Sequence, residues 1–167
     1  TFIRTGAISH RDSLGNEGRT AAGDVQVMSA GTGIVHSEHN REDDATTLFQ
    51  IWIRPDRTGE APSWGQREFP KSERAGRWSI VASGDPEGDN ALTLRADARV
   101  LAATLEAGQT AEYAADPARH CYLVAAKGRI RVNGQEAGPR DGVAIEGERA
   151  IRVEAIDDAE VVMVDTL

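Results

Sequence analysis

The sequence predicts an all-β fold made of many short strands. Its apolar residues recur mostly with a period of two or in short runs, and Gly, Asp, Asn and Pro separate these runs, which is typical of strands joined by turns. No segment carries the sustained helical stripe of apolar residues that would define a helix-rich protein. The chain has 167 residues, 40% of them apolar, which suffices for one globular domain or two small ones.

Taken in order, the predicted strands cover residues 1–10, 25–29, 33–39, 47–53, 78–82, 98–105, 121–126, 129–132, 142–145, 150–155 and 160–165. Two turns support this pattern, DSLGN at residues 12–16 and VNGQ at residues 132–135. Both are predicted to be hairpin tips, because Gly and Asn-Gly adopt the positive φ that such turns require. Residues 54–77 hold three prolines and many charges but little periodicity, so we expect a long connection there.

The two halves of the chain resemble each other weakly. Residues 6–38 and the shorter stretch 128–155 follow the same order of strand, turn and strand. A duplicated small β-barrel explains this economically, because each copy could close its own sheet and bury one face. We therefore predict an N-terminal barrel with its connection at residues 1–76 and a C-terminal barrel at residues 77–167.

Composition disfavours several classes of function. The chain has 19 basic and 27 acidic residues, a net charge of −8, so its surface as a whole does not attract nucleic acid or anionic lipid. Cys121 is the only cysteine, which excludes an intrachain disulfide and a cysteine-rich zinc site. No apolar run approaches the roughly 20 residues that span a bilayer, and the first residues lack the charged-then-apolar order that is typical of a secretion signal. We expect a soluble cytoplasmic protein.

The stretch GTGIVHSEHN, residues 31–40, is the strongest candidate for a functional site. Side chains alternate faces along a strand, so His36 and Glu38 should point one way and His39 the other. An imidazole and a carboxylate about 6.5–7 Å apart along the backbone can converge on one ion. This pair suits Fe(II), Mn, Ni, Cu or Zn better than Ca or Mg. From the spacing alone, His36 and Glu38 could equally be the solvated polar end of a strand.

Two ligands do not make a tight centre, since catalytic metals usually have three or more protein ligands. His10 and His120 are the remaining histidines. His10 precedes a predicted turn, which favours a solvated position or a strand-end hydrogen bond over metal ligation. His120 stands at the start of a strand in the second half.

The run HRDSLGNEGRTAAGDVQVMSAGTGIVHSEHN, residues 10–40, resembles the signature of the pirin family, bicupin proteins of the cupin superfamily. LFQIWIRP, residues 48–55, is similar to the strand that follows it in the family, and KGRIRVNG and DGVAIEGE extend the resemblance. The bacterial pirin-like quercetin 2,3-dioxygenases are the branch that it resembles most. The resemblance implies two cupin-type jelly-roll barrels in tandem.

The resemblance also implies one divalent transition metal in the N-terminal barrel, held by three histidines and a glutamate. By position, His36 is the third histidine and Glu38 the glutamate. The family's first two histidines lie in a His-Pro-His stretch, which we expect upstream of Thr1 in residues missing from this sequence. Fe(II) is the expected metal, with Cu, Ni, Mn and Zn as alternatives. The second barrel has no matching ligands, so its expected role is structural or in shaping the cavity mouth.

The activity implied is the O₂-dependent opening of a flavonol ring, as in quercetin 2,3-dioxygenase. A metal would lower the pKa of the flavonol 3-hydroxyl, and Glu38 would act as general base. Gln26 and Met28 share a face of a neighbouring strand and are predicted to line the substrate cavity.

Two other functions stay open. One is a regulatory, transcription-cofactor or redox-sensing module that binds metal and a protein partner without turnover. The other is a metal-free cupin that binds a sugar or a small acid. We expect a monomer without direct nucleic-acid or membrane contact.

Overall fold

The computed structural model describes residues 1–167 and confirms an all-β protein. Apart from the strands, regular structure is limited to the 3-10 helix η1 (Lys71–Arg74) and the one-turn helix α1 (Pro86–Asp89). Neither helix is long and apolar enough to cross a membrane. The chain divides into two compact units, residues 1–70 with 83–96 and residues 71–82 with 97–167. The division at residue 76 that the sequence suggested stays a prediction.

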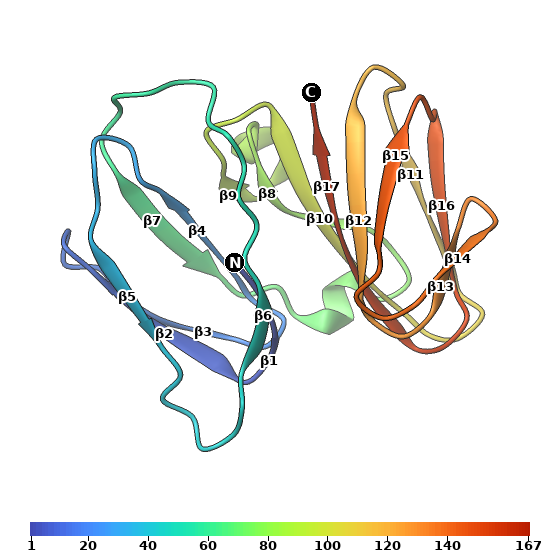
Figure 1. The fold of residues 1–167 in the computed structure, drawn as a ribbon, viewed down its shortest axis with the longest axis horizontal. Helices are drawn as coiled ribbons and strands as arrows, with labels where there is room; N and C mark the ends of the chain where they lie inside the picture. The colour runs from blue at the N-terminus through green and yellow to red at the C-terminus, as the bar shows by residue number, and fades with distance from the viewer. The chain divides into compact units, whose positions relative to one another are not determined.

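The first unit consists of two small antiparallel sheets that face each other (Figure 1). One sheet has the order β6-β1-β4-β7 and the other the order β3-β2-β5. Phe2, Ile3, Ile8 and Val25 are buried in this unit. The strands of this unit are β1 (Phe2–Thr5), β2 (Ala7–Asp12), β3 (Glu17–Ala21), β4 (Val25–Ser29), β5 (His36–His39), β6 (Thr47–Phe49), β7 (Ser63–Arg67) and β9 (Leu92–Thr93).

The predicted strand at residues 1–10 is wrong in one respect, because it is split at Gly6 into β1 and β2. Gly6 has a φ of +73°, and a Cβ at this position would lie 2.4 Å from Thr46 Oγ1. Thr46 Oγ1 accepts a hydrogen bond from the Ala7 N–H at 3.2 Å and donates one to the Ala7 carbonyl at 3.0 Å. Glycine thus lets the chain turn a corner from one sheet into the other. This corner places β2 beside β5.

The second unit is also built from two antiparallel layers (Figure 1). Its core is filled by apolar side chains that are almost fully buried, among them Leu101, Leu123, Ile130 and Val153. One layer has the order β15-β12-β17-β10-β8 and the other β11-β16-β13-β14. The strands are β8 (Ser79–Ser83), β10 (Ala98–Leu105), β11 (Thr110–Ala114), β12 (His120–Lys127), β13 (Ile130–Val132), β14 (Gln135–Ala137), β15 (Gly142–Glu146), β16 (Ala150–Ala155) and β17 (Ala159–Thr166).

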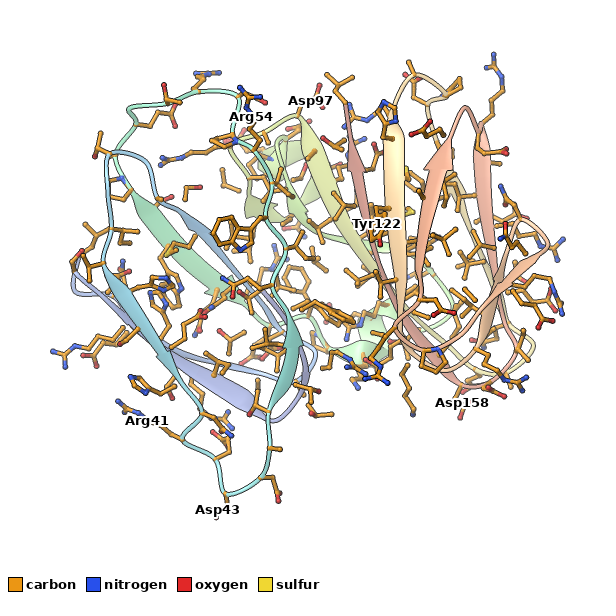
Figure 2. All side chains as sticks on the ribbon, in the orientation of Figure 1. Arg41, Asp43, Arg54, Asp97, Tyr122 and Asp158 are labelled. Carbon is orange, nitrogen blue, oxygen red and sulfur yellow. The ribbon has the colours of Figure 1, made fainter.

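Both predicted hairpin turns are confirmed. Asn133 and Gly134 have φ of +46° and +90° and join β13 to β14, as expected for an Asn-Gly turn. Gly15, with a φ of +88°, lies in the turn between β2 and β3. Asp43 and Asp158 lie in exposed connections, the first in the loop from β5 to β6 and the second in the turn from β16 to β17 (Figure 2).

Several strands differ from the prediction. The strand expected at residues 33–39 is shorter in the structure and consists of β5, and the strand expected at residues 47–53 is reduced to β6. The sequence did not predict β3, β9, β11 or β14. The expected connection at residues 54–77 contains β7, whose sequence SWGQR has no apolar alternation. β7 pairs with β4 along its whole length. Long-range pairing, rather than local pattern, therefore forms this strand.

Candidate metal centre

The candidate site lies on one face of the sheet β3-β2-β5 and is set by the pairing of β2 with β5. In this antiparallel pair, His10 stands directly opposite Glu38, and Asp12 stands opposite His36. Residues directly opposite each other point to the same face of a sheet. The alternation predicted from the sequence is therefore present, with His36 and Glu38 on one face, and β2 adds two more polar side chains to it.

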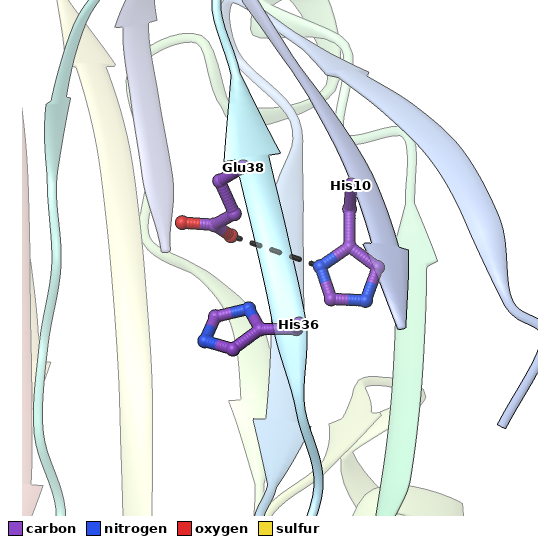
Figure 3. A group of neighbouring side chains, drawn as sticks. All are labelled: His10, His36 and Glu38. Carbon is purple, nitrogen blue, oxygen red and sulfur yellow. Dashed lines mark ion pairs between the residues drawn. The ribbon is translucent and has the colours of Figure 1, made fainter. Parts of the chain in front are cut away.

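His10, His36 and Glu38 converge within this face (Figure 3). One potential ligand atom from each residue lies within 4.8 Å of the other two. His10 Nδ1 is 3.9 Å from Glu38 Oε1, and the two imidazole centroids are 5.5 Å apart. His10 is buried, Glu38 is half-buried and His36 is exposed.

His10 is placed differently from the sequence expectation. A solvated position is wrong, because only 3% of the residue is exposed. The expected hydrogen bond is present, between His10 Nε2 and Asp12 Oδ2 at 3.1 Å. The indole ring of Trp64 stacks on the imidazole, with centroids 4.6 Å apart and planes 7° from parallel. Trp64 comes from β7, in the segment expected to be a connection, so its contact with His10 could not be predicted from local pattern.

Asp12 is held as an ionised carboxylate. Burial alone would raise its pKa, but hydrogen bonds from the side chains of Asn16 and His10 and from the backbone N–H groups of Asn16 and Leu14 outweigh burial and lower the pKa to about 2. An ionised carboxylate can only accept hydrogen bonds. In its bond with Asp12, His10 Nε2 is therefore the donor.

Gln26 connects Glu38 to the opposite sheet. Its Nε2 donates a hydrogen bond to Glu38 Oε1. Its Oε1 accepts from Trp64 Nε1 and from Thr20 Oγ1, each at 3.3 Å. Met28, the other predicted cavity residue, is half-buried and stands opposite Trp64 in the β4–β7 pair. Contact of Gln26 or Met28 with a substrate stays a prediction.

Gly18 provides the space in which Trp64 lies. It stands opposite His10 in the β2–β3 pair, and a Cβ at residue 18 would lie 2.3 Å from Trp64 Cη2. Sequence reasoning missed Gly18 and Asp12. Asp12 could have been found, because it lies two residues after His10 and therefore on the same face of a strand.

The residues present fit a transition metal. His10 Nδ1 is buried without a hydrogen-bond partner, which is costly unless another group satisfies it. Two imidazoles and a carboxylate form a donor set suited to Fe, Mn, Ni, Cu or Zn. His39 is exposed and pairs with Ser9. His120 lies on β12 of the second unit, with Nδ1 3.3 Å from Glu146.

Comparison with known proteins places these features in a family. A sequence profile described as Pirin matches residues 1–53, and one described as Quercetinase C-terminal cupin domain matches residues 80–166. A Pseudomonas aeruginosa protein named as a candidate quercetin 2,3-dioxygenase is 58% identical over 99% of this chain and 71% of its own length. The quercetin 2,3-dioxygenase of Escherichia coli is 35% identical over 99% of this chain and 70% of its own length.

Solved structures agree with this result. A bacterial pirin from Escherichia coli in complex with nickel(II) is 34% identical and superposes with a TM-score of 0.89, covering 99% of this chain and 70% of that one. The prediction of two cupin-type barrels in tandem is confirmed by these similarities and by the two β-units of the chain.

Proposed function

The chain belongs to the pirin family of bicupin proteins, and from this premise we propose that it is a metal-dependent dioxygenase of the quercetin 2,3-dioxygenase type. The observation that carries the proposal is the convergence of His36, Glu38 and a buried imidazole nitrogen on one face of β2 and β5. Relatives named for this activity, at 58% and 35% identity, support the reaction class.

His36 and Glu38 would hold the metal, together with two histidines that the family pattern places before residue 1. Fe(II) is the proposed ion, and Ni, Cu, Mn and Zn suit the same donors. When bound, the metal supplies Lewis acidity that lowers the pKa of a flavonol 3-hydroxyl and favours reaction of the flavonolate with O₂.

Glu38 is the proposed general base. Its carboxylate would take the proton of the 3-hydroxyl, because a carboxylate beside the substrate hydroxyl is a suitable acceptor for it. The hydrogen bond from Gln26 restrains the carboxylate from the opposite sheet. Trp64, which donates to Gln26 and stacks on His10, gives this side of the site an apolar wall. Gln26 and Met28 are proposed to contact the flavonol.

The second unit is proposed to have a structural role. Its interior is filled by buried apolar side chains such as Leu123, Ile151 and Met163. Its histidine, His120, is exposed on β12. A filled apolar core of this kind stabilises a domain.

The proposal is tested by O₂ uptake on addition of quercetin to metal-loaded protein made from its complete gene. Replacing Glu38 by Ala should reduce the rate by at least about 100-fold, the usual size of a general-base contribution. Glu17→Ala is the matched control, because Glu17 is an exposed carboxylate on β3 that pairs with Arg11. Its rate should equal that of the wild type.

An unchanged rate in Glu38→Ala would refute the role of Glu38. Full metal loading without any quercetin-dependent O₂ uptake would instead favour the regulatory module, which binds metal and a protein partner without turnover.

A further inference from the structure

We propose that Trp64 and Gln26 act in series as positioning residues for Glu38. The indole N–H of Trp64 fixes the direction of the Gln26 amide, and the amide fixes the carboxylate. This inference rests on the metal centre of the proposed function and adds no ligand to it. Two side chains of the sheet β6-β1-β4-β7 would thus hold a metal ligand that belongs to the sheet β3-β2-β5.

The first step is the indole ring of Trp64, whose place is set by two neighbours. The ring stacks on His10, with 4.6 Å between the centroids and 7° between the planes. Gly18 leaves the room that the ring occupies, because a Cβ at residue 18 would lie 2.3 Å from Trp64 Cη2. The indole N–H therefore has a defined position, with Nε1 3.3 Å from Gln26 Oε1.

The second step is the direction of the Gln26 amide. An indole N–H can only donate a hydrogen bond, so the amide oxygen faces Trp64 and the amide nitrogen faces away from it. A carboxylate that binds a metal is ionised and can only accept hydrogen bonds, and Gln26 Nε2 donates to Glu38 Oε1. Both partners thus require the same direction, and a reversed amide would lose both hydrogen bonds.

The third step is the burial of Gln26. Only 3% of the residue is exposed, so an amide without partners at this position would be costly. That cost keeps the amide on its two partners and restrains the Glu38 side chain before an ion binds. Carboxylates that bind metals are themselves hydrogen-bonded in this way, which orients them. An amide nitrogen carries two N–H groups, so this role is compatible with the proposed contact of Gln26 with the flavonol.

The test is a calorimetric titration of metal-free protein, made from its complete gene, with Ni²⁺. Gln26→Met removes both hydrogen bonds and keeps a side chain of similar length. It should weaken Ni²⁺ binding by about 10- to 100-fold, as the loss of a group that orients a metal ligand usually does. Gln66→Met is the matched control, because Gln66 is exposed and stands directly opposite Gln26 in the β4–β7 pair. It should bind Ni²⁺ as the wild type does.

The serial arrangement is tested by a double variant. Trp64→Phe keeps an aromatic ring beside His10 but removes the indole N–H, and it should weaken Ni²⁺ binding by about 2- to 10-fold, the effect of one hydrogen bond. Added to Gln26→Met, it should weaken binding no further, because Trp64 acts through Gln26. Effects that multiply in the double variant would overturn the arrangement in series. If Gln26→Met does not fold, unchanged Ni²⁺ affinity in Trp64→Phe would overturn it too.

A second measurement needs no metal. In protein labelled with ¹⁵N-tryptophan, the three tryptophans give three indole N–H signals, and the signal absent from Trp64→Phe belongs to Trp64. Gln26→Met should shift this signal upfield and speed its exchange with solvent, because the indole loses its acceptor. Gln66→Met should leave it in place. A Trp64 signal that Gln26→Met does not move would overturn the proposal.

The outcomes separate this inference from the proposed function. Equal Ni²⁺ affinity in the wild type and a folded Gln26→Met would remove both positioning roles and leave the dioxygenase proposal intact. Weakened Ni²⁺ binding in Gln26→Met, combined with no quercetin-dependent O₂ uptake by the wild type, would retain the positioning roles and overturn the dioxygenase.

Discussion

Replacing Gly18 by Ala should disturb the candidate site without altering any polar group in it. The added Cβ would lie 2.3 Å from Trp64 Cη2 and 2.7 Å from Gln66 Oε1. Carbon atoms in good contact are about 3.5–4.0 Å apart, so the indole ring must retreat by more than about 1 Å. The ring is rigid and is held by its stack on His10 and its hydrogen bond to Gln26.

The expected cost follows from these contacts. Overpacking of a buried site costs about 1–3 kcal/mol, whereas replacing glycine by alanine in an unstrained position gains only about 0.4–1 kcal/mol. We therefore expect Gly18→Ala to lower the free energy of unfolding by roughly 1–2 kcal/mol. Because Trp64 stacks on His10, the same change should also alter the environment of the indole ring and hence the aromatic spectrum of the protein.

Urea unfolding and near-ultraviolet circular dichroism would measure these two effects on the protein. Gly65→Ala is the matched control, because its Cβ would meet nothing closer than Leu92 Cδ2 at 3.6 Å, an ordinary contact. It should be as stable as the wild type or slightly more so. A Gly18→Ala protein with the stability and the aromatic spectrum of the wild type would refute the account of how Trp64 is held.

Other predictions concern the second unit. Leu123→Ala should lower the free energy of unfolding in urea by about 2–5 kcal/mol, because Leu123 is fully buried in the core; a loss below about 1 kcal/mol would contradict this packing. Burial, with the hydrogen bond to Asp165, raises the pKa of Tyr113 to about 12, so the unfolded chain loses this proton first. The contribution of this raised pKa to the free energy of unfolding should be complete below about pH 10 and decline between about pH 10 and pH 12. Absorbance titration of the wild type, with Tyr113→Phe as the reference, would contradict this if the Tyr113 phenol ionised at about pH 10, as an ordinary phenol does. Burial, with the charge of Asp165, raises the pKa of Cys121 to about 11, so alkylation of the native protein by iodoacetamide should be slow at pH 8 and accelerate toward pH 11; rapid reaction at pH 8 would contradict a buried thiol.

The strands that could be predicted best are those whose own residues determine which side is buried. β10 and β16 were predicted with their observed bounds, residues 98–105 and 150–155, because their apolar residues recur regularly and lie in the core of the second unit. β7 and β11 were missed, because SWGQR and TAEYA have no such regularity. Those strands depend on their pairing with β4 and β16.

The candidate site shows the same limit. The period of two along β5 sufficed to put His36 and Glu38 on one face, since this follows from strand geometry alone. His10 joins them because β5 pairs with β2, although β4 is nearer to β5 in the sequence and belongs to the other sheet. No local pattern encodes that pairing. The contact with Trp64 is equally non-local, since 54 residues separate it from His10.

The most direct test of the central claim is the amount of transition metal per chain, measured by elemental analysis. Protein made from its complete gene would be compared with the same protein carrying His36→Ala, an exposed position where the substitution should not affect folding. We predict close to one ion per chain in the wild type and its loss in the variant. No metal in either protein, or equal metal in both, would contradict a centre built on His36 and Glu38.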